Sequence, residues 1–137
     1  MVGNSSGDNL FSTVNGLDIY RLFSITGART VTFININFIN GIVNNANGGA
    51  IYASNSNSKI YVVNSSFTNN KATNGGAIHG TTVTITSSNF TSNTATSTVS
   101  GWGYGGGAVF GTTVTVTDSN FYNNYASAKG GGIYGNN

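Results

Sequence analysis

The chain has 137 residues, of which only 6% are charged, and its formal net charge is +2. This length fits one domain, and the five Lys and Arg residues are too scattered to follow a phosphate backbone, so nucleic acid is an unlikely class of partner. The chain lacks cysteine, which excludes a disulfide framework. It also lacks an apolar run of about 18 residues, so this segment is not expected to insert into a membrane.

Residues 1–28 contain none of the motifs that follow them, but their apolar side chains, Leu17, Ile19 and Tyr20 among them, are dense enough that we expect them in the core. The pairs Asn15-Gly16 and Thr26-Gly27 are typical of turns and divide this region into short pieces. We therefore expect a degenerate first coil here, in preference to a helical N-terminal cap. Residues 29–137 are expected to form a four-repeat domain, as part of a longer array.

From residue 29 onward the chain repeats one pattern four times: a valine-rich strand, a Phe, an Asn-rich turn, and a Gly-Gly pair with an aliphatic residue after it. The first aliphatic residue of each strand precedes the Phe by seven residues in every copy. The four Phe residues are Phe38, Phe67, Phe90 and Phe121, and the Gly pairs are 48–49, 75–76, 106–107 and 130–131. Self-similarity at a period of a few tens of residues indicates a stacked solenoid.

Within each repeat the residue types predict particular places in a coil. Segments 81–86 and 112–117 alternate Thr with Val or Ile, which predicts strands with one buried face. The Phe residues are expected to stack inside, one above another. Asn tolerates left-handed backbone and suits the corners, and Asn side chains from successive coils can form a hydrogen-bonded ladder. The Gly pairs indicate positive φ or close backbone approach.

A coil of a few tens of residues can hold two or three small strands and no helix. Equivalent strands must then pair in parallel, and parallel crossovers are right-handed in nearly all proteins. The predicted fold is all-β: a right-handed parallel β-helix of about five coils, spaced about 4.8 Å apart.

Two of these motifs resemble a known family. Phe67-Thr-Asn-Asn70 with Gly75-Gly-Ala-Ile78, and Phe90-Thr-Ser-Asn93 with Gly106-Gly-Ala-Val109, resemble the FxxN and GGA-[ILV] motifs of the polymorphic membrane proteins, which are autotransporter adhesins. They resemble the adhesin-like surface proteins of methanogenic archaea still more closely. In the first repeat, Gly41 stands where the Asn should be. The resemblance implies an extracellular, cell-surface β-helix stalk used in adhesion, and it supplies no catalytic residues.

The sequence offers little material for catalysis. The only acidic residues are Asp8, Asp18 and Asp118, and glycoside hydrolysis normally needs two carboxylates about 5–9.5 Å apart. Asp118 occupies a repeat position held by neutral residues in the other copies, so no carboxylate pair is expected. His79 is the sole histidine, which argues against a metal site. We expect a non-enzymatic protein without cofactors.

Two groups of aromatic residues are candidate binding sites. Tyr52, His79, Phe110 and Tyr134 occupy equivalent positions after the Gly pairs and are expected to form an outer ladder, for packing between coils or for stacking against sugar rings. Trp102 and Tyr104 lie among glycines in the longest interval between a Phe and its Gly pair. Such an insertion often emerges on the binding face of a solenoid, although a Trp there can also fold back over an apolar seam.

Two functions remain open. The first is an adhesin-like surface module whose partner is an unidentified glycan or protein of another cell. The alternative is a filament subunit that self-associates through its coil ends, since unprotected strand edges invite strand addition. The outer Thr rows could also suggest ice binding, but Lys59 and Tyr61 interrupt them.

Overall fold

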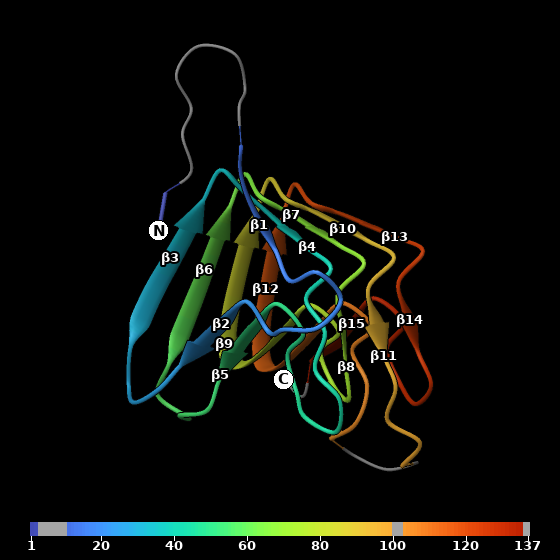
Figure 1. Ribbon diagram of the computed structural model, residues 1–137. Helices are drawn as coiled ribbons and strands as arrows, with labels where there is room; N and C mark the ends of the chain where they lie inside the picture. Colours follow the sequence, from blue (N-terminus) through green and yellow to red (C-terminus); the bar gives the residue numbers. More distant parts are fainter. Residues whose placement is uncertain (3–10, 100–102, 136–137) are drawn as a thin grey trace.

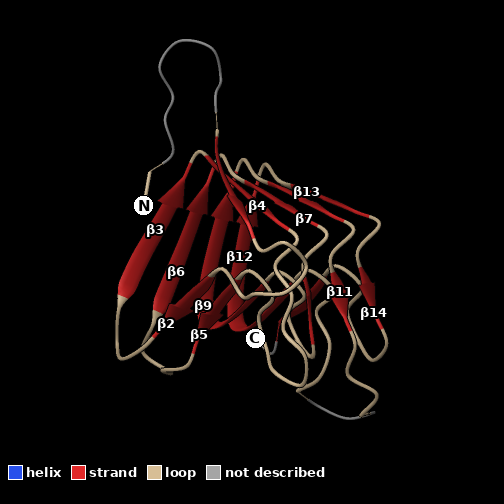
Figure 2. Cartoon of the chain, viewed as in Figure 1, coloured by secondary structure: helices blue, strands red, loops and turns tan. Residues whose placement is uncertain are grey.

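The computed structural model describes residues 1–2, 11–99 and 103–135. Every regular element within these ranges is a β-strand. Strands of successive coils pair in parallel and in register, so the chain winds into a column (Figures 1 and 2). The predicted all-β, parallel β-helical fold is confirmed. No helix long and apolar enough to span a membrane occurs in the described part of the chain.

Three parallel sheets form the sides of the column. The first contains β1 (Ser12–Asn15), β4 (Ile36–Ile39), β7 (Ser66–Thr68), β10 (Asn89–Thr91) and β13 (Asn120–Tyr122). The second contains β8 (Lys71–Ala72), β11 (Thr94–Ala95) and β14 (Tyr125–Ala126). The third contains β2 (Phe23–Ile25), β3 (Thr30–Ile34), β5 (Ile51–Ala53), β6 (Lys59–Val63), β9 (Ile78–Thr86), β12 (Val109–Thr117) and β15 (Ile133–Gly135).

The long strands β9 and β12 each join the end of one coil to the start of the next. The first residues of β9 pair with β5, and its later residues pair with β6. Figure 1 shows β3, β6, β9 and β12 side by side and pointing the same way. Four repeat coils follow one N-terminal coil, to which β1 and β2 belong.

The Phe residues stack in the interior, as the constant spacing predicted. Phe38, Phe67, Phe90 and Phe121 are aligned by the pairing of β4, β7, β10 and β13. Their ring centroids lie 4.4, 4.6 and 4.7 Å apart, and the planes are within 10° of parallel. The first three rings are fully buried. Burial of a Phe contributes about 1.5–3 kcal/mol, so this stack supplies much of the stability of the column.

The two glycines of each Gly pair have different tasks. The first has positive φ in every copy, for example 58° at Gly75 and 67° at Gly106. The second, such as Gly76, has no room for a side chain, because a Cβ atom there would lie 2.6 Å from the backbone N and O of Thr94 and would clash with the carbonyl O of Gly107. Both predicted reasons for glycine are therefore confirmed, each at one position of the pair.

The N-terminal coil differs from the repeats at one corner. The carbonyl O of Tyr20 accepts the N–H of Ile42 at 3.1 Å, as the O of Asn70 accepts the N–H of Thr94 at 2.8 Å. Tyr20 therefore occupies the place of the repeat Asn. Between Gly16 and Tyr20 the chain makes a turn in which Leu17 and Asp18 have positive φ.

Candidate functional surfaces

An asparagine ladder closes one corner of the column. The Oδ1 of Asn93 accepts the backbone N–H of Asn70 at 3.0 Å, and the Oδ1 of Asn124 accepts that of Asn93 at 2.9 Å. Each Nδ2 donates to the carbonyl of a Phe in the previous coil, as Asn93 does to Phe67 at 2.9 Å. Asn70 and Asn93 are fully buried, and the ladder ends where Asn70 accepts the N–H of Gly41. The predicted ladder is confirmed.

A second, serine ladder was not predicted. The Oγ of Ser65 accepts the N–H of Ile36 at 3.2 Å, the Oγ of Ser88 accepts that of Ser65 at 3.1 Å, and the Oγ of Ser119 accepts that of Ser88 at 3.0 Å. Each of these hydroxyls also donates to the carbonyl two residues earlier. The motif that carries both ladders is S-x-F-x-x-N, and the sequence shows it three times.

The predicted aromatic ladder lies on the outside of the third sheet. Strand pairing aligns Tyr52, His79, Phe110 and Tyr134. The rings of His79 and Phe110 are 4.7 Å apart and parallel within 1°, and those of Phe110 and Tyr134 are 5.2 Å apart and within 8°. His79 lies 5.5 Å from Tyr52 at a tilt of 48°. Neighbouring rings thus cover most of one another's faces, which leaves mainly the edges open to a ligand.

Both ends of the aromatic ladder are held by other parts of the chain. At one end the guanidinium of Arg21 lies 4.8 Å from the ring centroid of Tyr52 and donates to the carbonyls of Gly48 and Asn47. At the other end the hydroxyl of Tyr134 accepts the N–H of Gly103 at 3.0 Å, and Tyr134 is only 9% exposed. The described geometry fits packing between coils, whereas binding of a sugar by this ladder stays a prediction.

His79 is uncharged in the folded protein. Burial lowers its pKa from 6.5 to about 4, and the positive charge of Arg21 acts in the same direction. Its Nδ1 is buried and has no hydrogen-bond partner.

Acid should therefore destabilise the protein through His79. Below pH 6.5 the unfolded chain binds a proton that the folded chain rejects, so the free energy of unfolding should fall by up to about 3 kcal/mol as the pH approaches 4. His79→Phe, which copies Phe110, should remove this loss. Urea unfolding of both proteins between pH 4 and 7.5 measures the difference, and equal pH dependence of the two proteins would contradict the assignment.

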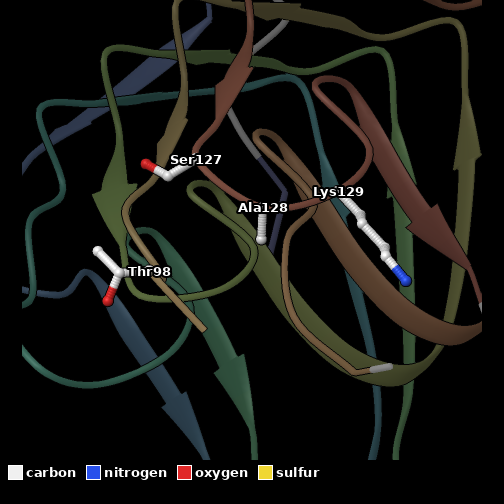
Figure 3. A pocket seen from close by; sticks show the side chains of 4 residues that line it. All are labelled: Thr98, Ser127, Ala128 and Lys129. Atoms are coloured by element: carbon white, nitrogen blue, oxygen red, sulfur yellow. The ribbon is translucent and has the colours of Figure 1, made fainter. Parts of the chain in front are cut away.

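The insertion before the third Gly pair lies against the last coil. Trp102, a predicted binding residue, lies outside the described residues. Tyr104 is half-buried, and Gly105 pairs with Lys129 in an isolated bridge. Figure 3 shows a pocket next to this insertion, with Thr98 on one side and the segment Ser127, Ala128 and Lys129 on the other. The volume of the pocket is about 150 Å³, and the described residues that line it include no carboxylate.

The structure places apolar side chains on the surface, and for three residues of the N-terminal coil this shows that the expected position in the core is wrong. Leu17, Ile19 and Tyr20 are 64–65% exposed on the turn of the N-terminal coil. Four backbone and side-chain hydrogen bonds hold this turn, in which the N–H groups of Leu17, Asp18, Ile19 and Tyr20 are the donors. On the last coil, Tyr122 and Tyr125 are 73% and 60% exposed. The Asn15-Gly16 pair indicated the turn but not which side chains it would expose.

The two acidic residues in the described part of the chain, Asp18 and Asp118, lie on different coils. Asp118 shares its repeat position, a corner with positive φ, with Asn35, Asn64 and Ser87. Asp18 lies on the turn of the N-terminal coil, at the other end of the column, and Asp8 lies outside the described residues. Among the described residues no group of three His, Cys, Asp or Glu side chains could hold a metal ion.

Comparison with family models finds one match. Residues 64–81 and 118–136 each match the Chlamydia polymorphic membrane protein repeat. Both segments run from the corner that precedes the Ser of the ladder to the strand after the Gly pair, and both include the S-x-F-x-x-N motif. Neither the curated proteins nor the solved structures gave a match. Two segments of this β-solenoid are therefore similar to the polymorphic membrane protein repeat.

Proposed function

We propose that this chain is a non-enzymatic, extracellular adhesin-like module: a stiff β-helical stalk segment that contacts another cell or a matrix. The observation that carries this proposal is that both segments matched by the polymorphic membrane protein repeat contain residues of the Ser and Asn ladders. These ladders bond one coil to the next. The resemblance to adhesin-like surface proteins of methanogenic archaea, which is part of this proposal, would imply the same function.

The internal ladders favour a mechanical role. The side chains of Asn70, Asn93 and Asn124 pair along the axis of the column, and the Phe rings stack in the same direction. The repeat coils therefore contact one another through backbone, amide and aromatic groups at once. Such a column can carry outer loops at fixed positions, which suits a protein that presents contact residues at a distance from the surface of its own cell.

Contact with a partner requires side chains on the outside. The aromatic ladder turns mainly ring edges outward, so we assign the contact to the insertion that contains Trp102 and Tyr104. Its half-buried Tyr104 lies between Gly103 and Gly105, both of which have positive φ. The partner we expect is a glycan or protein at the surface of another cell.

Adhesion can be tested with beads that carry the purified chain. Beads with the natural chain should bind to intact cells or to a glycan array, and soluble chain should compete. Tyr104→Ala should reduce binding at least tenfold, whereas Tyr61→Ala, on the outer face of β6 away from the insertion, should leave it unchanged. Absence of binding to any surface would contradict the adhesin function, and turnover of a polysaccharide by the chain would contradict its non-enzymatic character.

A further inference from the structure

Asparagine that precedes a small residue is chemically labile, and this chain contains many such pairs. In the reaction the backbone nitrogen of the following residue attacks the side-chain carbon Cγ of the Asn. A C–N bond forms, the amide group leaves Cγ as ammonia together with the proton of the attacking nitrogen, and water opens the cyclic imide to aspartate or isoaspartate. Attack is fastest before glycine, which has no Cβ to hinder it. The chain has four Asn-Gly pairs, at 15–16, 40–41, 47–48 and 74–75.

The fold blocks the attacking nitrogen in all four Asn-Gly pairs. A nitrogen whose hydrogen is bonded must lose that bond before it can attack, so reaction at these pairs requires two coils to separate locally. In every pair the glycine N–H donates to an acceptor in the next coil, at 2.8–3.0 Å: Gly16 to the carbonyl of Ile39, Gly41 to Oδ1 of Asn70, Gly48 to the carbonyl of Asn74, and Gly75 to the carbonyl of Gly105.

The pair Asn55-Ser56 has a free attacking nitrogen. It lies in the connection between β5 and β6, at the outside of the column (Figure 1). Ser56 is exposed, and its N–H donates to no acceptor in the part of the chain that the structure describes. The Oδ1 of Asn55 accepts the N–H of Asn57 at 2.9 Å. This oxygen becomes negatively charged when Cγ is attacked, and the N–H of Asn57 stabilises that charge.

The pair Asn15-Gly16 shows that the free nitrogen is the decisive difference. The Oδ1 of Asn15 accepts the N–H of Leu17 at 2.9 Å, which is the same local arrangement as at Asn55. Gly16 is also the more reactive neighbour by its sequence, but its N–H is bonded to the next coil.

The other two Asn-Ser pairs in the described ranges are blocked in the same way as the Asn-Gly pairs. The N–H of Ser58 donates to the carbonyl of Asn55 at 3.0 Å, and the N–H of Ser65 donates to Oγ of Ser88 at 3.1 Å. Of the described Asn residues that precede Gly or Ser, only Asn55 therefore has a free neighbouring nitrogen.

We infer that Asn55 is the site at which the folded chain is modified by deamidation. The product, aspartate or isoaspartate, adds one negative charge and takes the formal net charge from +2 to +1. The change occurs in an outer connection, away from the Phe stack and from the Ser and Asn ladders. The protein can therefore acquire this charge at its surface while the column remains intact, and this inference does not depend on the proposed adhesin function.

The test follows deamidation of the full chain over time in mildly alkaline buffer, by peptide mapping with mass spectrometry. In the folded chain Asn55 should convert at least tenfold faster than any of the four Asn-Gly pairs, because these must first open. In concentrated urea the order should reverse, with the Asn-Gly pairs converting first. Conversion of any other described Asn as fast as that of Asn55 in the folded chain would overturn the inference, as would the same order of sites with and without urea.

Two variants of one exposed residue test the attacking nitrogen itself. Ser56→Gly removes the Cβ beside that nitrogen and should speed conversion of Asn55 at least tenfold, while the four Asn-Gly pairs of the same molecule stay slow. Ser56→Val adds a branched side chain and should slow conversion at least tenfold. Circular dichroism checks that both variants are folded. Equal rates at Asn55 in the natural chain and both variants would overturn the assignment.

Discussion

Replacing Gly76 by alanine is expected to prevent the column from forming. The new Cβ would lie 2.6 Å from the backbone N and O of Thr94 and would clash with the carbonyl of Gly107 in the next coil. Because those backbone atoms belong to segments that are hydrogen-bonded between coils, they cannot move away without breaking these hydrogen bonds. We expect a loss of more than about 4 kcal/mol, which is most of the stability of a typical domain. Circular dichroism and thermal unfolding measure it.

The matched control is Gly131→Ala in the last coil. Gly131 occupies the same repeat position, but its Cβ would meet only the carbonyl O of Asn124, at 3.2 Å. The variant should unfold within about 1 kcal/mol of the natural chain. If the two variants were equally stable, the coils could not approach one another as closely as described.

Replacing Asn93 by alanine is expected to cost roughly 3 kcal/mol or more. This side chain accepts the N–H and the Nδ2 of Asn70 and donates to the carbonyl of Phe67, and all of these groups are buried. Removing it leaves several buried polar groups unpaired, at about 1–3 kcal/mol each. Urea unfolding monitored by circular dichroism measures the change in the free energy of unfolding.

Asn89→Ala is the comparison for this second prediction. Asn89 also takes part in a side-chain ladder, because its Oδ1 accepts the Nδ2 of Asn120 at 3.0 Å, but this pair is exposed to solvent. Water can replace the lost bond, so the cost should stay below about 1 kcal/mol. A loss at Asn89 as large as that at Asn93 would show that burial does not determine the strength of these ladders.

The repeat spacing was sufficient to predict the register of the fold. The constant distance from strand to Phe placed Phe38, Phe67, Phe90 and Phe121 in one stack, because residues at the same offset from paired strands lie above one another even when the coils differ in length. The reasons for glycine at Gly75 and Gly76 were predicted correctly, because glycine is commonly required either for positive φ or for close approach of another backbone segment. The sequence suggested a single role for the corner Asn residues, but the structure shows two adjacent positions with different roles. The first position has positive φ and is held by Asn69, Ser92 and Asn123, and the residue after each of them forms the ladder.

Other features depend on the direction in which a backbone group points or on whether a neighbouring coil covers a side chain. The repeat spacing contains no information about either. The serine ladder arises because the N–H groups of Ser65 and Ser88 point along the column toward the next coil. The exposure of Val116 depends on what lies above the last coil, although its sequence context matches that of the buried Ile85. The outward side chains of Leu17 and Ile19 follow from a turn with two consecutive positive φ angles, which the sequence only partly indicated.

The most direct test of the stacked column is the contact between Phe67 and Phe90. Their ring centroids lie 4.6 Å apart, whereas Phe67 and Phe121 belong to coils that are separated by the coil of Phe90. In a deuterated chain with protonated phenylalanine, NMR should show strong nuclear Overhauser effects between the rings of Phe67 and Phe90 and between those of Phe90 and Phe121, but none between Phe67 and Phe121. Absence of the first two effects, or a direct effect between Phe67 and Phe121, would contradict the parallel β-helix described above.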